Sequence, residues 1–222
     1  MLKTIFKHLV VLQFVIGSVA VLAETYHFLP INPNNNNIGA PNAVGNQLTL
    51  DVTDSGLGSA LFSFTNSGVI SSSIVDVYFS DPAPIIFSTF SIFSQSFGVN
   101  FSLDSPNPAN FPEGGPSFIE VASADAAGGG VNEIPNGINA LNESLVFAAI
   151  FSGTNNFESL IAAINSGDFK IGLQTRDNSQ GGNPSTDRWL NDTPVNAVPL
   201  PAAAWLFGSA LLGFAGLSRR RL

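Results

Sequence analysis

The 222-residue chain contains no cysteine, and only 11% of its residues are charged. The missing thiols exclude disulfide bonds, zinc–thiolate sites, iron–sulfur clusters and cysteine nucleophiles. The few charges exclude a charge-driven disordered chain and a coiled coil rich in glutamate and lysine. The chain has 1 methionine, but 19 phenylalanines, 21 glycines and 14 prolines. Aromatic strand formers and turn residues therefore dominate, which favours an all-β fold stabilised by packing.

Basic residues are scarce in the middle of the chain. Five of the eight lie in the first seven or the last four residues, whereas all 16 acidic residues lie between Glu24 and Asp192. Without its two ends, the body would carry three basic residues against 16 acidic ones, a net charge of −13. Such a body repels nucleic acid, and its charge suits a soluble exported protein.

Residues 1–23 have the organisation of a secretory signal peptide. Two lysines begin the segment, an apolar run from Leu9 to Ile16 follows, and small or modest side chains precede Glu24. This order predicts cleavage after Ala23. The alternative is an uncleaved membrane anchor or a buried helix.

Residues 202–222 combine an apolar stretch with a basic end. Residues 202–217 read AAAWLFGSALLGFAGL, and three arginines follow them. As a helix this stretch would extend over roughly 24 Å, which can span a ~30 Å hydrocarbon core if the bilayer thins and the arginines snorkel. The arginines favour a cytoplasmic C-terminus, so we expect the body to lie outside the membrane. Pro199 and Pro201 keep the helix from extending backwards and leave a cleavable stalk.

This order of motif, apolar helix and basic tail closely resembles the VPLPA variant of the PEP-CTERM sorting signal of Gram-negative bacteria. In that family an exosortase, an integral-membrane enzyme similar to cysteine transpeptidases, recognises the motif and processes the protein on its way to the cell surface or an exopolysaccharide matrix. The resemblance implies an exosortase as partner and a transient inner-membrane anchor. It implies a recognition motif of Val198, Pro199, Leu200, Pro201 and Ala202, and stop-transfer charges at Arg219, Arg220 and Arg221. The alternative is a tail anchor that is never processed.

Between the two ends the sequence predicts one folded domain. Residues 24–46 are rich in asparagine and proline and predict a loop or an irregular edge, whereas residues 47–192 alternate apolar and polar side chains over short runs. Residues 193–201 form a linker that includes the motif, and residues 202–222 the membrane helix and basic tail. Seven to nine short strands in about 150 residues predict an antiparallel β-sandwich.

The strands are expected near residues 48–53, 60–65, 75–79, 118–121, 144–151 and 169–174, with two more within 85–103 that break near 96–98. Residues 126–130 are expected to be flexible. One short helix is expected, because Asn155 and Glu158 have the spacing of a capping box and an apolar stripe follows from Phe157. Gly167 is expected to end this helix.

The segment from Asn136 to Asn191 is similar, over about a quarter of the chain, to the ectodomains of some PEP-CTERM proteins. NGIN at 136–139, an apolar strand, a short helix ending in NSG and the strand KIGLQ follow in that family's order. Two positions depart from it: Asn142-Glu143 replaces Gly-Glu, and Gln174-Thr175 replaces part of His-Val-Gln.

Acidic and amide side chains gather in two loop-rich stretches. The first holds Asp104, Glu113, Glu120, Asp125 and Glu133, and the second holds Asp177, Asn178, Asn183 and Asp187. Both are interpreted first as solvated surface. If the first group converges, it suits calcium better than acid–base catalysis, because calcium accepts carboxylate, amide and backbone oxygens. No EF-hand or nonapeptide repeat occurs, so no cofactor is predicted and calcium is expected to matter little to the fold.

The sequence predicts a non-enzymatic protein. Its mature body has a single histidine, His27, beside the expected new N-terminus, and it contains no G-x-S-x-G motif. Trp189 stands among polar residues, where an exposed ring would stack on a sugar; the alternative is a core or sheet-edge position. We expect a secreted, exosortase-sorted protein with a structural or adhesive role in exopolysaccharide or biofilm. The alternative is a carbohydrate-binding module acting on exopolysaccharide, assisted by calcium.

Overall fold

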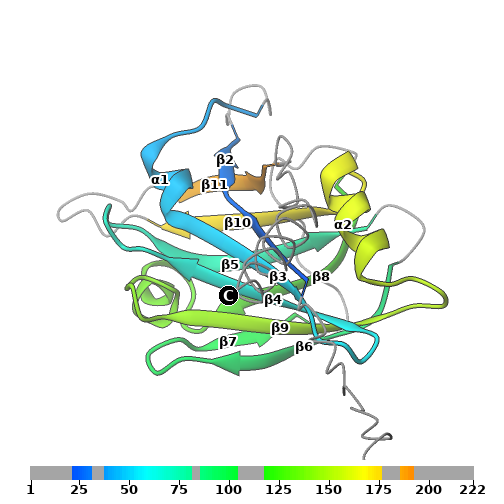
Figure 1. Ribbon diagram of the computed structural model, residues 1–222. Helices are drawn as coiled ribbons and strands as arrows, with labels where there is room; N and C mark the ends of the chain where they lie inside the picture. The colour runs from blue at the N-terminus through cyan, green and yellow to red at the C-terminus, as the bar shows by residue number, and fades with distance from the viewer. Residues whose placement is uncertain (1–21, 32–37, 82–85, 105–117, 177–185, 193–222) are drawn as a thin grey trace, which may run out of the picture.

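The computed structural model describes residues 22–31, 38–81, 86–104, 118–176 and 186–192. These residues form two antiparallel sheets that enclose one hydrophobic core, as Figure 1 shows. No helix within these ranges is long and apolar enough to cross a membrane. The expected anchor and most of the expected signal peptide lie outside the described residues, and the expected cleavage point after Ala23 falls within the first strand.

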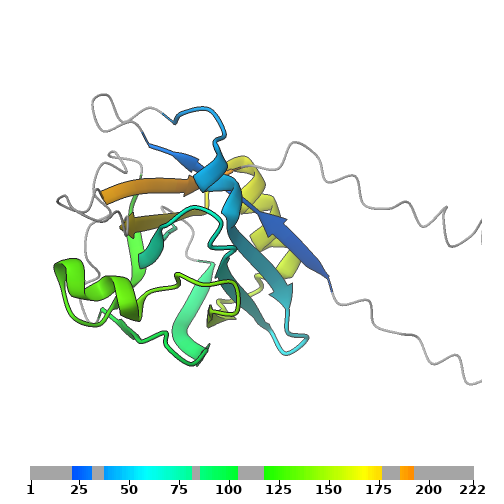
Figure 2. The same ribbon diagram turned by 90° about the vertical axis from the view of Figure 1, so that its left-hand side faces the viewer.

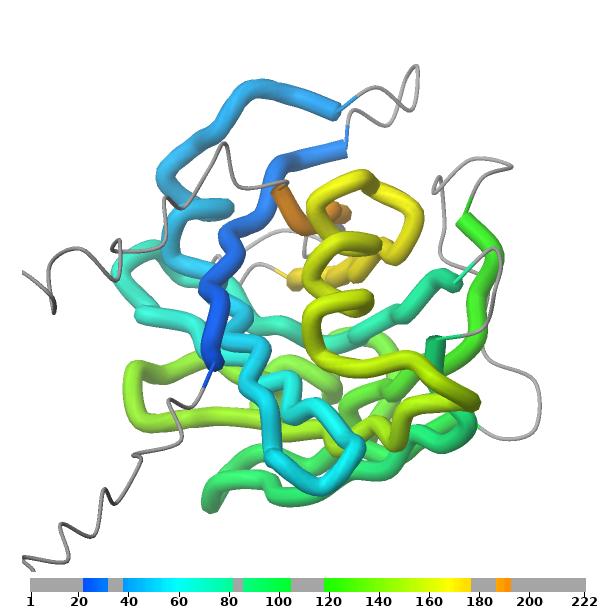
Figure 3. The backbone as a smooth tube through the Cα atoms, turned by 45° about the vertical axis from the view of Figure 1, so that its right-hand side comes forward, coloured from blue at the N-terminus to red at the C-terminus, as the bar shows by residue number. Residues whose placement is uncertain are grey.

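The five-stranded sheet has the order β1-β3-β4-β9-β6. Its strands are β1 (Ala23–Tyr26), β3 (Leu48–Asp54), β4 (Ser59–Asn66), β9 (Ser144–Phe151) and β6 (Phe87–Gln95). Figure 3 shows β1, in blue, running beside β3, in cyan. Every strand pair in this sheet is antiparallel, as the sequence predicted.

The six-stranded sheet has the order β2-β11-β10-β5-β8-β7. Its strands are β2 (Phe28–Pro30), β11 (Thr186–Asn191), β10 (Lys170–Arg176), β5 (Ser73–Ser80), β8 (Glu120–Ala126) and β7 (Phe101–Leu103). Its pairs are antiparallel too. The alternating runs of the sequence thus became strands, and the stretch 85–103 divides into β6 and β7 as expected.

The N-terminal segment is more regular than the sequence indicated. Its described part contains β1, β2 and the short helix α1 (Ala43–Gln47), so the expectation of a loop is wrong there. Both strands lie at sheet edges, which agrees with the other expectation for this segment. Tyr26 pairs with Leu50 and Phe28 with Asn191, so one short stretch adds an edge strand to each sheet.

Phenylalanine rings join the two sheets. Phe79 of β5 meets Phe62, Phe64 and Phe147 of the opposite sheet, with ring centroids 5.3, 6.1 and 5.2 Å apart and edge-to-face angles. All four side chains are fully buried. Edge-to-face aromatic pairs contribute about 0.5–1.5 kcal/mol each beyond their buried area. The abundance of phenylalanine therefore supplies the contact between the sheets.

The expected helix exists as α2 (Phe157–Ser166), and its apolar stripe packs into the core. Its cap lies one residue later than expected. Asn156, not Asn155, is the N-cap, and Ser159, not Glu158, completes the capping box, with reciprocal hydrogen bonds of 2.9 Å. The backbone of Asn156 is extended, as an N-cap requires. Gly167 ends the helix in the left-handed conformation, as predicted.

One more helical turn, the 3₁₀ helix η1 (Gly130–Asn136), was not expected. Figures 1 and 2 show η1 and α2 on opposite sides of the sandwich. The residues after η1 hold it against β5. A Cβ on Gly137 would lie 2.3 Å from the carbonyl oxygen of Ile74, and the carboxylate of Glu143 accepts the backbone N–H of Asn139 at 2.7 Å. Within the segment from Asn136 to Asn191, Gly137 and Glu143 thus have structural roles.

Candidate functional site

Four acidic side chains gather on the face of the six-stranded sheet that points away from the core. Asp76 of β5 and Asp125 of β8 are directly opposite each other in the strand pairing. Asp104, just after β7, accepts a hydrogen bond from the Ser123 hydroxyl of β8 at 3.1 Å. Glu133 of η1 is close enough to raise the pKa of both Asp76 and Asp125. We call these four side chains the acidic cluster.

The acidic cluster departs from the first interpretation of this stretch, a solvated surface, and realises part of the alternative, in which its acidic residues converge. Three members of the first acidic stretch converge, which are Asp104, Asp125 and Glu133. Glu120 pairs with Ser80 near the other end of β5, and Glu113 lies outside the described residues. Asp76 was missed. The only signal for it was a charged residue inside the otherwise apolar run of β5, all of whose residues are buried.

Asp76 and Asp125 share a hydrogen bond between their carboxyl groups. Asp76 is 6% exposed, and its burial, together with the charge of Asp125, raises its pKa to about 8. Burial also raises the pKa of Asp125, to about 6, although the hydrogen bond from Asp76 opposes this. At neutral pH, Asp76 therefore keeps its proton and donates it to the carboxylate of Asp125.

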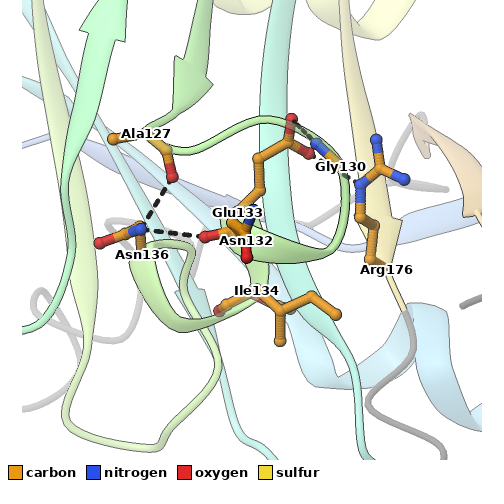
Figure 4. A network of polar contacts seen from close by, with 8 residues as sticks. Ala127, Gly130, Asn132, Glu133, Ile134, Asn136 and Arg176 are labelled. Carbon is orange, nitrogen blue, oxygen red and sulfur yellow. Dashed lines mark hydrogen bonds and ion pairs between the residues drawn. The ribbon is translucent and has the colours of Figure 1, made fainter.

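One cation balances the acidic cluster. The Arg176 side chain of β10 donates from Nε to Oε2 of Glu133 at 2.7 Å, as Figure 4 shows. The other oxygen of Glu133 accepts the backbone N–H of Gly130 at 2.8 Å. The Asn136 amide donates to the backbone carbonyl oxygens of Ala127, before η1, and of Asn132, within it. The ion pair between Arg176 and Glu133 fastens η1 to the end of β10. The positive charge of Arg176 lowers the pKa of Asp76, but burial and the neighbouring carboxylates raise it by more.

A small apolar cluster covers the neighbouring part of this face. Tyr78, which follows the acidic cluster along β5, packs with Ile31, Phe118 and Leu190. Burial and the nearby carboxylates raise the pKa of the Tyr78 phenol, so it stays neutral. Apolar side chains thus cover part of the outer face of the six-stranded sheet, and the acidic cluster lies beside them.

The geometry of the carboxyl pair does not suit glycoside hydrolysis. The two carboxyl groups of a glycosidase flank the scissile bond at roughly 5–9.5 Å, whereas those of Asp76 and Asp125 are bonded to each other. Within the described ranges, no group of three or more acidic or histidine side chains has the arrangement of a metal site. A shallow depression on η1 and the residues after it is lined by Val131, Ile134, Pro135, Asn139 and Glu143, and by no member of the acidic cluster. The chemistry that this pair can perform is proton uptake and release.

Trp189 lies in the core of the sandwich. It is 2% exposed, and its indole N–H donates to the hydroxyl of Thr175 at 2.8 Å. A buried ring presents no face to a sugar, so the structure corrects the glycan-contact hypothesis in favour of the core alternative. Of the second polar stretch only Asp187, which pairs with Thr175 across β10 and β11, is described; Asp177, Asn178 and Asn183 lie outside the described residues.

The sorting residues also lie outside the described residues, both the motif at 198–202 and the arginines at 219–221. No protein-family model, no curated protein and no solved structure matches the chain.

Proposed function

We propose that the protein is exported, processed by an exosortase at its C-terminal signal, and retained at the cell surface or in the extracellular matrix. There it has a structural or adhesive role in exopolysaccharide or biofilm. The observation that carries this proposal is the order of features at the C-terminus, where VPLPA at 198–202 precedes an apolar stretch and three arginines. The signal-peptide pattern at residues 1–23 supports it, because both ends then place the body outside the inner membrane.

One feature of the folded body supports a non-enzymatic role. The most perturbed carboxyl pair, Asp76 and Asp125, is bonded to itself and lies beside packed side chains. Trp189, the best single candidate for a glycan contact, is buried, so we do not pursue the carbohydrate-binding alternative.

A double substitution, Pro199→Ala with Pro201→Ala, tests the sorting proposal. Alanine is about 3 kcal/mol more favourable than proline inside a helix, so the membrane helix would extend back through the motif. The altered motif would then be hidden in helical backbone. We expect the variant to accumulate as an uncleaved inner-membrane form with its body outside, detected by membrane fractionation with an antibody to the body.

Pro194→Ala is the matched control, because it makes the same change in the linker before the motif. It is expected to be released like the wild type. Normal release of the double variant would show that processing does not read this motif. Intact-mass measurement of the released protein should give a chain that begins at Glu24 and lacks residues 203–222, and a mass that includes those residues would refute processing.

A further inference from the structure

The four sheet edges of the sandwich differ in how they are protected. An edge strand exposes unpaired backbone N–H and C=O groups, and proteins commonly limit this with short strands, charges, proline or a covering group. Three edges follow this rule. β1 has four residues and carries Glu24, β2 has three and ends at Pro30, and β7 has three. The side-chain amide of Gln95 also bonds both the N–H and the C=O of Phe101 in β7.

β6 is the exception. It has nine residues, FSTFSIFSQ, with no charged residue and no proline. Among the described strands it pairs with β9 alone. Two bulges interrupt this pairing, but the register is regular from Thr89 to Ile92. Bulges also limit edge pairing, so they protect the two ends of β6, but the regular segment between them carries no charge or proline and is a template for one more strand.

The surroundings of β6 indicate what that strand belongs to. The body carries 16 acidic residues and only three basic ones, so two copies repel each other over most of their surface. β6 and its next two neighbours, β9 and β4, contain no charged residue. A second copy that approaches through this edge therefore meets no charged side chain on these three strands, although the carboxylate of Glu143 lies beside the turn after β6, against Gly98. Phe93 and Phe97, which are 66% and 102% exposed, lie in β6 and just after it, where a second copy would cover apolar surface.

We propose that β6 is a self-association edge, where two copies of the chain pair their β6 strands antiparallel about a two-fold axis. The pairing joins two five-stranded sheets into one continuous sheet. A two-fold axis brings the same surface of both copies into contact, so each β6 strand makes the same hydrogen bonds to the other. This inference uses only the described residues and does not rest on the sorting proposal, so either can fail without the other.

Single-cysteine crosslinking of the full-length chain tests the pairing, because the natural chain has no cysteine to interfere. Ser91→Cys places a thiol at an exposed position of β6, and Ser71→Cys places one at a position between β4 and β5 that is also exposed. With a short bismaleimide, we expect Ser91→Cys to give a product of twice the chain mass and Ser71→Cys to remain a single chain. A monofunctional maleimide checks that both thiols react.

A second test places a positive charge on β6. Thr89→Lys in the Ser91→Cys background puts a lysine on the edge strand, a change that disfavours edge pairing, and we expect it to abolish the crosslinked product. Thr65→Lys makes the same change on β4, within the sheet, and should leave the product unchanged. A monomeric Ser91→Cys chain, equal crosslinking at Ser71, crosslinking to a different protein, or a product that survives Thr89→Lys would each overturn the proposal.

Discussion

Replacing Asp76 with asparagine should make the protein more stable at alkaline pH. Asp76 is buried and shares its proton with Asp125, and its pKa of about 8 lies far above the ordinary value of about 3.9. The folded state therefore binds a proton that the unfolded state has already released. Stability is thus present at low pH and is lost as pH rises from about 4 to about 8. Asparagine has no proton to lose, and its amide can still donate to Asp125.

The size of the effect follows from the pKa. A tenfold change in proton affinity corresponds to about 1.4 kcal/mol, so the ionised Asp76 costs the folded state on the order of 5 kcal/mol. Because Asp125 titrates together with Asp76, we expect the measured difference to be a few kcal/mol. The wild type should lose this stability between about pH 4 and about pH 8, and Asp76→Asn should lose much less.

Urea denaturation of the released protein at several pH values measures this, with the fluorescence of the buried Trp189 as the probe. Glu158→Gln is the control, because it removes one negative charge from an exposed position on α2. It should keep the wild-type pH dependence, including the part that comes from general repulsion among acidic groups. Asp76→Asn could also keep the wild-type dependence of unfolding free energy on pH, or be less stable than the wild type at alkaline pH. Either result would show that the proton shared by Asp76 and Asp125 does not cause the loss of stability.

Three further substitutions test the packing of the sandwich. Phe79→Ala removes the ring that joins the two sheets and should cost about 3–5 kcal/mol in urea denaturation; a loss below about 1 kcal/mol would contradict its central position. Gly45→Ala should cost about 1–3 kcal/mol, because its Cβ would lie 2.1 Å from the carbonyl oxygen of Phe28; an unchanged melting temperature would show that α1 shifts freely. Trp189→Phe should cost about 1–3 kcal/mol, because it leaves the Thr175 hydroxyl without its buried partner; Trp189→Phe combined with Thr175→Val should recover part of this loss.

The sequence predicted the strands whose alternation extends over five or more residues, because a period of two is a strong signal at that length. It did not predict β1, β2 or β11. β1 and β2 each offer only one or two inward-facing residues, in a segment dominated by asparagine and proline, and β11 surrounds Trp189 with polar residues. The pairing of these strands is a tertiary effect. The cap of α2 was misplaced by one residue, because Asn155 and Asn156 are both good capping residues and only the backbone decides between them.

The candidate site was predictable only in part, for a similar reason. Asp104, Asp125 and Glu133 are near one another in the sequence, so their grouping could be proposed from spacing. Asp76 joins them only because β5 pairs with β8, and no local pattern reveals which strands are neighbours. The burial of Trp189 likewise depends on its neighbouring strands, since a tryptophan among polar residues suits either a surface or an interior position.

Under the export proposed above, the hydrogen bonds between the two ends of the domain have a consequence for how it folds. The backbone N–H of His27, between β1 and β2, donates to the Asp192 side chain at 3.1 Å, and its carbonyl oxygen accepts the Asp192 N–H at 2.9 Å. These residues are 165 positions apart, so the contact closes only after almost the whole domain has emerged. A chain threaded from its N-terminus delivers β2 first and its partner β11 last. Until β11 arrives, β2 has no strand beside it and β10 is an open edge, so the six-stranded sheet is completed only when the end of the domain has crossed.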